Sequence, residues 1–486
     1  MSTETASAPT TDLSRVHDNP FSISRQRESI AIITEAARRA GSYIANAPHR
    51  PIAPSADAVA ALDVFRRPLQ ERAIPAREVL AELDTFGSPA TVVQTHGRYF
   101  GFVNGGLDPA ARGAAVLAGT WDQNAAMAIQ SPIAAALDDV STGWIVEALG
   151  LPSTSIASFC GGATIANLTG IIAARDALYA RLGWDVSQDG LVGAPALRVI
   201  VGEEVHATTL KALRLAGFGL SAVERVPTDD SGAIIADAFP TDTDERTLVL
   251  LQSGNVNTGA SDPFAAIIPG VRERGGWVHV DGAFGMWAAA SPKRRHQVAG
   301  IELADSWGTD AHKWLNVPYD SGIVIVRERA DLERACAMSA AYLATTDARA
   351  NLQLGIQSSQ RARGIETWAM LASHGKQGLA DLIDRTCDLA QRFADALATE
   401  GVHVLAPVAL NQVLVRFADA DGDPSDEMTT NVIAAVQAEG TLWAGPSQWH
   451  GSKAMRLSVS DAATTADDID VSAAVIVRLW RQLAIR

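Results

Sequence analysis

Short, continuous apolar runs that alternate with helical patterns dominate the middle of this 486-residue chain. Four of these runs are rich in β-branched residues and bounded by Gly, Asn or Asp, at 198–206, 247–255, 277–285 and 322–329. Helical periodicity fills the intervals between runs, for example at 163–183 and 208–219. Strands that are apolar along their whole length are typical of sheets covered by helices on both faces. The pattern therefore predicts an α/β protein with a mostly parallel central sheet.

The rest of the chain suggests three further parts around this large α/β domain, which we place at 96–375. Residues 1–20 are rich in Ser, Thr, Ala and Pro, which predicts a mobile tail. Helical patterns punctuated by proline at 21–95 predict an N-terminal arm without a core of its own, expected to pack on a partner subunit. A long helical pattern and two strand-like runs predict a small C-terminal α+β domain at 376–486.

Charge and cysteine content narrow the class of protein. A formal net charge of −15 argues against binding to nucleic acid or to an anionic membrane surface. The three cysteines are too widely spaced for a disulfide framework or a C-x-x-C metal site. The N-terminus lacks the apolar core of a secretory signal, and no apolar run approaches the roughly 20 residues of a membrane helix. We therefore expect a cytoplasmic protein.

Two segments place reactive groups where a strand passes into a helix. In "SFCGGATIANLTG" (158–170), two glycines precede a helix whose free N–H groups and dipole favour an anion such as phosphate. Thr164 could add a hydroxyl group, although an ordinary Gly-rich turn is the alternative. In "EEVHATTLKAL" (203–213), the ring of His206 could stack on a planar ligand or simply cap the following helix.

A third segment, "WVHVDGAFG" (277–285), ends an apolar strand with a carboxylate. The two-residue period of a strand places His279 and Asp281 on the same face. A buried carboxylate is costly to desolvate unless it meets a cation. A metal site is conceivable, although the segment offers only two ligands.

The fourth segment, "DAHKW" (310–314), sets Lys313 between His312 and Trp314, just ahead of an apolar run. An ordinary lysine would lay its stem along apolar surface and keep its amine in water. A lysine held away from water instead loses its proton more readily, and a neutral amine attacks carbonyl groups to form an imine.

One ligand, pyridoxal phosphate, would use all four segments together. Its phosphate suits the glycine turn at 161–164, and its ring could lie under His206. Its pyridinium nitrogen needs an anion, for which Asp281 is available, and its aldehyde needs the amine of Lys313. This chemistry explains why Lys313 lies among apolar residues, since the amine must lose its proton before it can form the imine.

The order of these motifs resembles that of fold type I pyridoxal-phosphate enzymes, which share the aspartate aminotransferase fold. More narrowly, "DAHKW", "HVDGAFG", "HGRYFGFVNGG", "WDQN", "SGNVNTGASDPF" and "MRLSVSDAATT" resemble the group II pyridoxal-dependent amino-acid decarboxylases, a family that includes aromatic-amino-acid and glutamate decarboxylases. The resemblance covers about residues 90–465. It implies a homodimeric enzyme that converts an L-amino acid to the corresponding amine and carbon dioxide with pyridoxal 5'-phosphate as cofactor.

The resemblance also implies roles for individual residues. Lys313 would form the Schiff base with the cofactor, Asp281 would pair with the ring nitrogen, and His206 would stack on the ring. The residues implied to contact the phosphate are Gly162, Ala163, Thr164 and His312.

Three further residues are implied less directly. Asn257 lies where the family commonly has a polar contact near the cofactor. Tyr342, in the segment at 335–355, corresponds to a tyrosine that protonates the substrate carbon from a mobile loop. Arg456 lies where related transaminases often bind a carboxylate.

Two groups of alternatives stay open. An aminotransferase, an aldehyde-forming decarboxylase or another lyase of the same fold would share Lys313 and Asp281. A metal-dependent hydrolase would instead use the side chains of His279, Asp281, Asp310 and His312.

Overall fold

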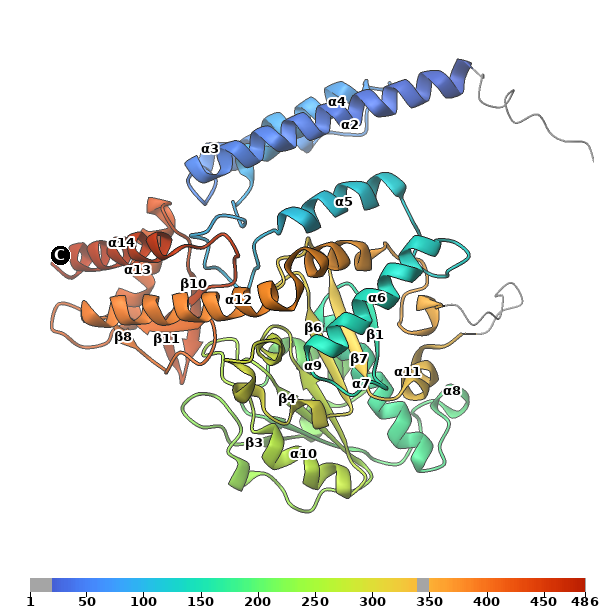
Figure 1. Ribbon diagram of the computed structural model, residues 1–486. Helices are drawn as coiled ribbons and strands as arrows, with labels where there is room; N and C mark the ends of the chain where they lie inside the picture. The colour runs from blue at the N-terminus through green and yellow to red at the C-terminus, as the bar shows by residue number, and fades with distance from the viewer. Residues whose placement is uncertain (1–19, 339–348, 486) are drawn as a thin grey trace, which may run out of the picture. The chain divides into compact units, whose positions relative to one another are not determined.

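The computed structural model describes residues 20–338 and 349–485, and the chain forms two compact units, Met1–Val93 and Gln94–Arg486 (Figure 1). The helices of the first unit are α2 (Pro20–Asn46), α3 (Ala56–Ala61) and α4 (Ala76–Glu82). Arg39 on α2 forms an ion pair with Asp84 at 2.8 Å, and the hydroxyl groups of Tyr43 and Thr91 are 2.8 Å apart. Polar contacts of this kind fasten α2 to the segment that follows α4.

A seven-stranded sheet with the order β1-β7-β6-β5-β4-β2-β3 forms the centre of the second unit. Its strands are β1 (Ile156–Cys160), β2 (Arg198–Gly202), β3 (Val223–Val226), β4 (Thr247–Gln252), β5 (Trp277–Asp281), β6 (Ser306–Asp310) and β7 (Gly322–Val326). Strands β2 to β6 pair in parallel, whereas β7 runs antiparallel to both β6 and β1. The predicted mostly parallel sheet is confirmed.

Helices cover both faces of this sheet, and the strands supply alternate residues to the two apolar cores (Figure 1). Leu248 and Leu250 of β4 pack with α7 (Ala163–Arg181), α9 (Ala207–Leu215) and α11 (Arg329–Cys336). Val249 and Leu251 point to the other face, with α6 (Pro132–Ala148) and α10 (Phe264–Glu273). The apolar runs are continuous because each strand needs apolar residues on both sides.

Strand β6 was not predicted from the sequence, because its residues, Ser306–Asp310, form no β-branched run. All five are nevertheless buried between β5 and β7. A Cβ atom on Gly308 would lie 2.1 Å from Oδ1 of Asn167, so glycine is needed for α7 to approach the strand. Close packing, rather than strand propensity, sets the composition of β6.

A smaller antiparallel sheet lies toward the C-terminus, with the order β10-β11-β9-β8. Its strands are β8 (His403–Val404), β9 (Gln412–Arg416), β10 (Gly445–Trp449) and β11 (Ser452–Ser458), and it packs with α12 (Arg363–Thr399), α13 (Asp426–Glu439) and α14 (Ala466–Ala484). The second unit also contains α5 (Pro109–Trp121) and α8 (Val186–Asp189).

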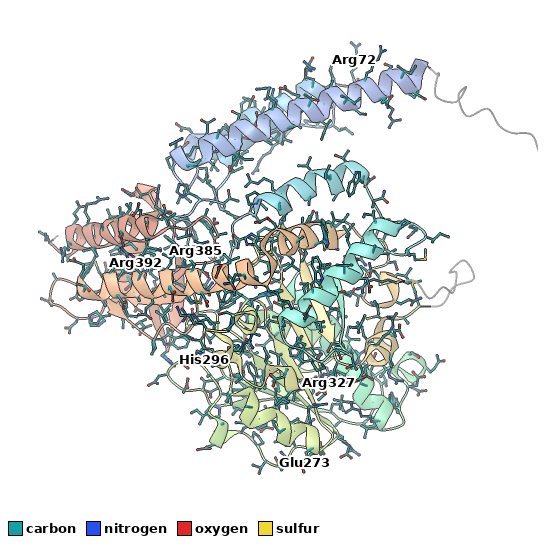
Figure 2. The ribbon with its side chains drawn as sticks, in the orientation of Figure 1. Arg72, Glu273, His296, Arg327, Arg385 and Arg392 are labelled. Atoms are coloured by element: carbon teal, nitrogen blue, oxygen red, sulfur yellow. The ribbon has the colours of Figure 1, made fainter. Side chains whose placement is uncertain are left out.

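Helix α12 contributes to the core on one face of the large sheet and to the core of the small sheet. The sequence predicts a helix from residue 375, but the structure begins it at Arg363 and interrupts it at Gly375, whose φ is +60°. Figure 2 shows Arg385 and Arg392 along its later half, where Arg392 binds Asp470 of α14 at 2.6 Å. The predicted domain boundary at 375/376 stays a prediction.

None of the helices in the described part of the chain combines the length and apolar character needed to cross a membrane.

Helix α7 lies so close to the sheet that a small side chain is essential at Gly170. A Cβ atom there would lie 2.5 Å from Cε1 of His279 on β5. We predict that Gly170→Ala lowers the free energy of unfolding by about 1–3 kcal/mol, because α7 would have to move off the sheet. Urea unfolding of the cofactor-free protein measures the change.

Gly143 on α6 provides the matched control, since a Cβ atom there would meet nothing within 4 Å. Gly143→Ala should leave stability unchanged or raise it by up to about 1 kcal/mol. Equal effects of the two substitutions would contradict the close packing at Gly170.

Candidate active site

A cavity of about 340 Å³ opens where β4, β5 and β6 end and α7 begins. Open α/β sheets bind their ligands at this carboxyl edge. The cavity brings together seven of the predicted site residues, namely Gly162, Ala163, Thr164, His206, Asp281, His312 and Lys313.

The glycine turn forms a concave wall at the start of α7. Gly162 precedes the helix with φ of +128°, which strongly favours glycine, and it offers no side chain to cap the helix. A Cβ atom on Gly322 of β7 would lie 2.4 Å from the Cα atom of Gly162, so the two backbones are in close contact. The wall therefore presents backbone and the helix N-terminus, which suit a phosphate group.

Asp281 ends β5 and is held as a hydrogen-bond acceptor. The Thr209 hydroxyl donates to Oδ2 at 2.6 Å, and the backbone N–H of Ala283 donates to Oδ1 at 3.2 Å. Both contacts fix the orientation of the carboxylate. The chemistry suits a protonated ring nitrogen.

His206 both lines the cavity and caps α9, so the two interpretations of this residue are compatible. Its Nδ1 accepts from the backbone N–H of Thr208 at 3.3 Å, while its own backbone N–H donates to Oε1 of Gln252 at 3.2 Å. Burial lowers the pKa of His206, and Lys313 lowers it further against the opposing effect of Asp281. The ring is therefore neutral at pH 7.

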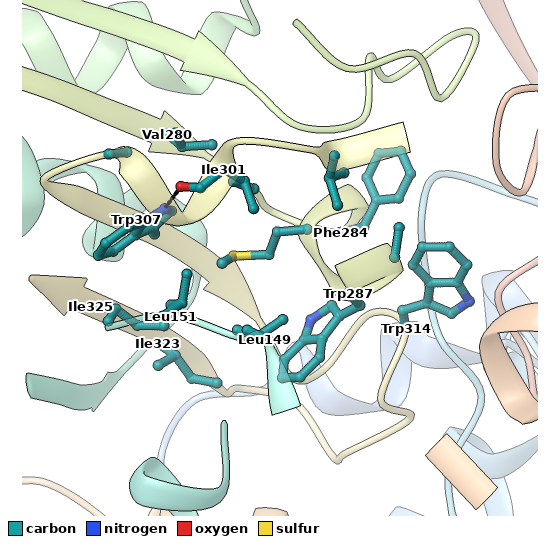
Figure 3. Packing of buried hydrophobic residues seen from close by; sticks show 14 of the residues in the cluster. Leu149, Leu151, Val280, Phe284, Trp287, Ile301, Trp307, Trp314, Ile323 and Ile325 are labelled. Carbon is teal, nitrogen blue, oxygen red and sulfur yellow. Dashed lines mark hydrogen bonds between the residues drawn. The ribbon is translucent and has the colours of Figure 1, made fainter. Parts of the chain in front are cut away.

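Lys313 lies in the loop that follows β6. Its Nζ lies 2.9 Å from Oδ2 of Asp310, and its side chain is 23% exposed. The next residue, Trp314, is 0% exposed and donates from Nε1 to the Thr386 hydroxyl of α12 at 2.8 Å. Figure 3 shows Trp314 in the apolar core beside Phe284, a cavity residue. The core thus fixes the backbone that carries the reactive amine.

His312, the residue before Lys313, packs against Ser321 and Tyr319. Its Nδ1 lies 2.9 Å from the carbonyl oxygen of Ser321, and its ring packs on that of Tyr319 with centroids 4.4 Å apart. Burial lowers the pKa of His312, which Asp310 opposes. The backbone N–H of Ser321 also lies 3.1 Å from Nδ1, and the other ring nitrogen, Nε2, lies 3.7 Å from Oδ1 of Asp310.

Asn257 and Arg456 are described but are not among the residues that line this cavity, and Tyr342 is not described. Asn257 is not among the cavity-lining residues in the described part of the chain; it bridges to β10, accepting from the Ser447 hydroxyl at 2.5 Å and donating to the Gln448 carbonyl at 3.3 Å. Asn257 therefore links the loop after β4 to the small sheet, and its predicted contact near the cofactor stays a prediction. Tyr342 lies outside the described residues. Arg456 is mostly buried on β11, with Nη1 3.2 Å from the carbonyl oxygen of Val256.

His279 shares the face of Asp281, as the two-residue period predicted, but it belongs to the core. Its Nδ1 lies 2.8 Å from the Ser306 hydroxyl and its Nε2 lies 3.1 Å from Oδ1 of Asn167. Within residues 20–338 and 349–485, no group of three or more His, Cys, Asp or Glu side chains could hold a metal ion. The structure thus gives the hydrolase alternative no metal centre among these residues.

Sequence reasoning missed two residues that shape the cavity, and it gave a third another role. Gln252 orients His206 and Thr209 orients Asp281, whereas Asp310, named above only as a possible metal ligand, binds Lys313. Gln252 is the polar last residue of β4, so its position was a usable signal. Thr209 gave none, because its contact depends on how α9 packs.

The residues present fit pyridoxal phosphate: a glycine-walled helix N-terminus, an anion held by Thr209, a flat neutral ring and a recessed amine lie around one cavity. Together with the two-layered helical cover of the sheet, this set defines a pyridoxal-phosphate enzyme.

Comparison with known proteins identifies the family. Residues 67–418 match the model of the pyridoxal-dependent decarboxylase conserved domain, and the chain belongs to that family. It is 27% identical over 367 residues to tryptophan decarboxylase 1 of Oryza sativa subsp. japonica, covering 68% of this chain and 70% of the relative. It is 24% identical over 359 residues to phenylacetaldehyde synthase of Arabidopsis thaliana, covering 69% and 72% of the two chains.

A solved structure shows the same fold. Oryza sativa TDC with PLP and tryptamine superimposes with a TM-score of 0.87 at 21% identity, covering 94% of this chain and 98% of that one. The predicted type I fold, the pyridoxal-phosphate cofactor and the decarboxylase class are confirmed, and the metal-dependent hydrolase alternative is wrong.

The buried ring of His279 makes stability depend on pH. Burial lowers its pKa, against the opposing effect of Asp281, from the usual value of about 6.5. Below pH 6.5 the imidazole of His279 therefore binds a proton in the unfolded chain but stays neutral in the folded chain. We predict that this residue costs up to about 1.4 kcal/mol of stability per pH unit as the pH falls from 6.5 to 5.

The comparison is between the unmodified protein and His279→Gln, through urea-unfolding curves of the cofactor-free forms. Burial raises the pKa of Asp138, Asp262 and Asp461 to about 6, which acts in the opposite direction. These groups are present in both proteins and cancel in the difference. Parallel pH dependences would contradict a neutral, buried His279.

Proposed function

We propose that this chain binds pyridoxal 5'-phosphate in the cavity at the carboxyl edge of the large sheet and there decarboxylates an L-amino acid to its amine. The observation that carries the proposal is the convergence of Lys313, Asp281, His206 and the glycine turn on one cavity. When bound, pyridoxal phosphate supplies a ring that accepts the electron pair left on the substrate when carbon dioxide departs.

Asp281 is proposed to hold a proton on the ring nitrogen of the cofactor. Its two donors, Thr209 and the Ala283 N–H, leave carboxylate lone pairs free for that proton. The buried setting strengthens this interaction.

Lys313 is proposed as the amine that attaches the cofactor and later accepts or returns protons at its Nζ. His206 would form one face of the ring site, where a neutral imidazole adds no charge to compete with the ring. Gly162, Ala163 and Thr164 would hold the phosphate, with His312 beside them.

Arg456 is proposed to bind the carboxylate of the substrate. Its guanidinium is buried deeply enough to lower its pKa to about 10, and no carboxylate pairs with it among the described residues. Its hydrogen-bond acceptor belongs to Val256, which lines the cavity. A buried cation without an anionic partner suits an anionic ligand.

We further propose a cytoplasmic homodimer. The three cysteines, Cys160, Cys336 and Cys387, are free, which fits a reducing compartment. Large apolar side chains are exposed on α5 and α6, where a second subunit could cover them; they are Val116, Leu117, Trp121, Ile133, Val140 and Trp144.

Lys313→Ala tests the assignment of the amine. Amine formation and carbon dioxide release from the best substrate in a panel of twenty amino acids should fall by roughly a thousandfold or more. After incubation with pyridoxal phosphate and borohydride, the unmodified protein should gain the cofactor mass at position 313.

Lys376→Ala is the matched control, because this lysine is exposed and paired with Glu147. It should keep both activity and cofactor. Cofactor mass on another residue of the unmodified protein would contradict the proposed role of Lys313.

A second candidate function is aldehyde formation, which the similarity to phenylacetaldehyde synthase favours. Tyr342 is proposed to protonate the substrate carbon, the step that commits the reaction to an amine. We predict that Tyr342→Phe diverts product from amine toward aldehyde, hydrogen peroxide and ammonia. Product analysis with oxygen uptake measures the change.

Tyr319 provides the comparison for this experiment, since its phenol also lines the cavity and donates to Oδ1 of Asn104 at 2.9 Å. Tyr319→Phe should leave the product an amine. An unmodified enzyme that already forms aldehyde would support the second candidate, and diversion by Tyr319→Phe alone would assign the proton to Tyr319.

A further inference from the structure

Asp310 brings a negative charge into the part of the cavity that should receive the phosphate. The residue ends β6, is 1% exposed and lines the cavity. Its Oδ1 accepts a hydrogen bond from the backbone N–H of Ala163 at 2.6 Å, and its Oδ2 lies 2.9 Å from Nζ of Lys313. One carboxylate therefore holds both groups that the cofactor must engage.

The contact with Ala163 is a helix cap supplied from another strand. Ala163 is the first residue of α7, and Gly162 before it has no side chain that could accept this hydrogen bond. A carboxylate at this position is stabilised by the helix dipole, as a phosphate would be. Asp310 and a phosphate thus compete for the same favourable position.

The charged groups that line the cavity are mostly negative, which adds to the competition between Asp310 and a phosphate. Among the described residues that line it, three carry carboxylates, Asp281, Asp310 and Asp320, and one, Lys313, carries an ammonium group. Asp320 is paired with Arg363 at 3.1 Å, and Asp281 faces the protonated ring nitrogen in the proposed function. Among the described residues, Lys313 is the lysine or arginine that pairs with Asp310, and the ring of His312, whose pKa is lowered by burial, lies 3.7 Å from it. In the proposed function the cofactor engages the amine of Lys313.

We propose that Asp310 occupies the phosphate position in the cofactor-free protein and, by its charge, weakens the binding of the phosphate group. This inference rests on the proposed cofactor site. A bound phosphate monoester carries about −1.5 to −2 charge at pH 7. A second anion in the same desolvated space opposes it, so Asp310 limits how strongly the phosphate contributes to cofactor affinity.

The test measures how much the phosphate contributes to binding. Cofactor-free protein is titrated with pyridoxal phosphate and with pyridoxal, followed by absorbance, and with inorganic phosphate, followed by calorimetry. Asp310→Asn keeps the size of the side chain and an oxygen that can accept from Ala163. It should raise the ratio of the pyridoxal to the pyridoxal-phosphate dissociation constant by about tenfold and tighten inorganic phosphate similarly.

The ratio separates two roles of Asp310. A change in the setting of Lys313 alters binding of both aldehydes equally, whereas loss of repulsion favours only the phosphorylated one. An unchanged or reduced ratio in the Asn variant would overturn the inference.

Asp310→Ala checks that lost charge, rather than a new amide donor, causes the effect. It should also raise the ratio, and a rise confined to the Asn variant would overturn the inference. Unfolding midpoints show whether each variant is folded. A folded variant of either kind is enough to show whether the ratio of dissociation constants rises or falls. Asp185→Asn is the control, because Asp185 accepts from the backbone N–H of Ser187 at the start of α8, away from the cavity; it should change nothing.

Failure of the proposed function has a different signature. In that case the unmodified protein would gain no cofactor mass at Lys313 after borohydride, whatever the behaviour of Asp310. Normal attachment at Lys313 with an unchanged ratio in the Asp310 variants would leave the function intact and remove only this inference.

Discussion

The burial of Trp314 is the constraint on which the active site depends. Its indole is enclosed in the core and hydrogen-bonded to Thr386 of α12. Because Lys313 precedes Trp314 in the chain, its backbone cannot shift without disturbing the core. A Cβ atom on Gly105 would lie 1.8 Å from the carbonyl oxygen of Lys313, so a second segment presses on the same backbone. The side chain of Lys313 is flexible, but the backbone that carries it is held in place.

The same principle extends to the groups around the amine. Asp281, His206 and Asp310 each end or follow a buried strand, and each is oriented by a polar partner one contact away. The sheet fixes where these side chains begin, while the helices α7 and α9 fix where they point. Preorganisation of this kind is what electrostatic catalysis requires, since no group has to be ordered during the reaction.

Much of this arrangement could be predicted from the sequence because it follows from local patterns. Continuous apolar runs reveal β2, β4, β5 and β7, and the glycine pair marks the start of α7. The two-residue period placed His279 and Asp281 on one face. What local pattern cannot tell is how deep a side chain lies on that face. His279 packs beneath Gly170 in the core, whereas Asp281 reaches the cavity two residues later.

The position of β6 and the partners of Asn257 could not be predicted from the sequence, for a related reason. The composition of β6 is dictated by the approach of α7 to Gly308, a contact between segments about 140 residues apart in the chain, so no local signal exists. Asn257 has a polar side chain close to the cavity in sequence, yet the approach of β10 gives it partners on the other side. Long-range packing therefore decides which of several suitable polar residues face the cofactor. The same holds for Asp310, because its hydrogen bond to Ala163 of α7 joins two segments that are far apart in the chain.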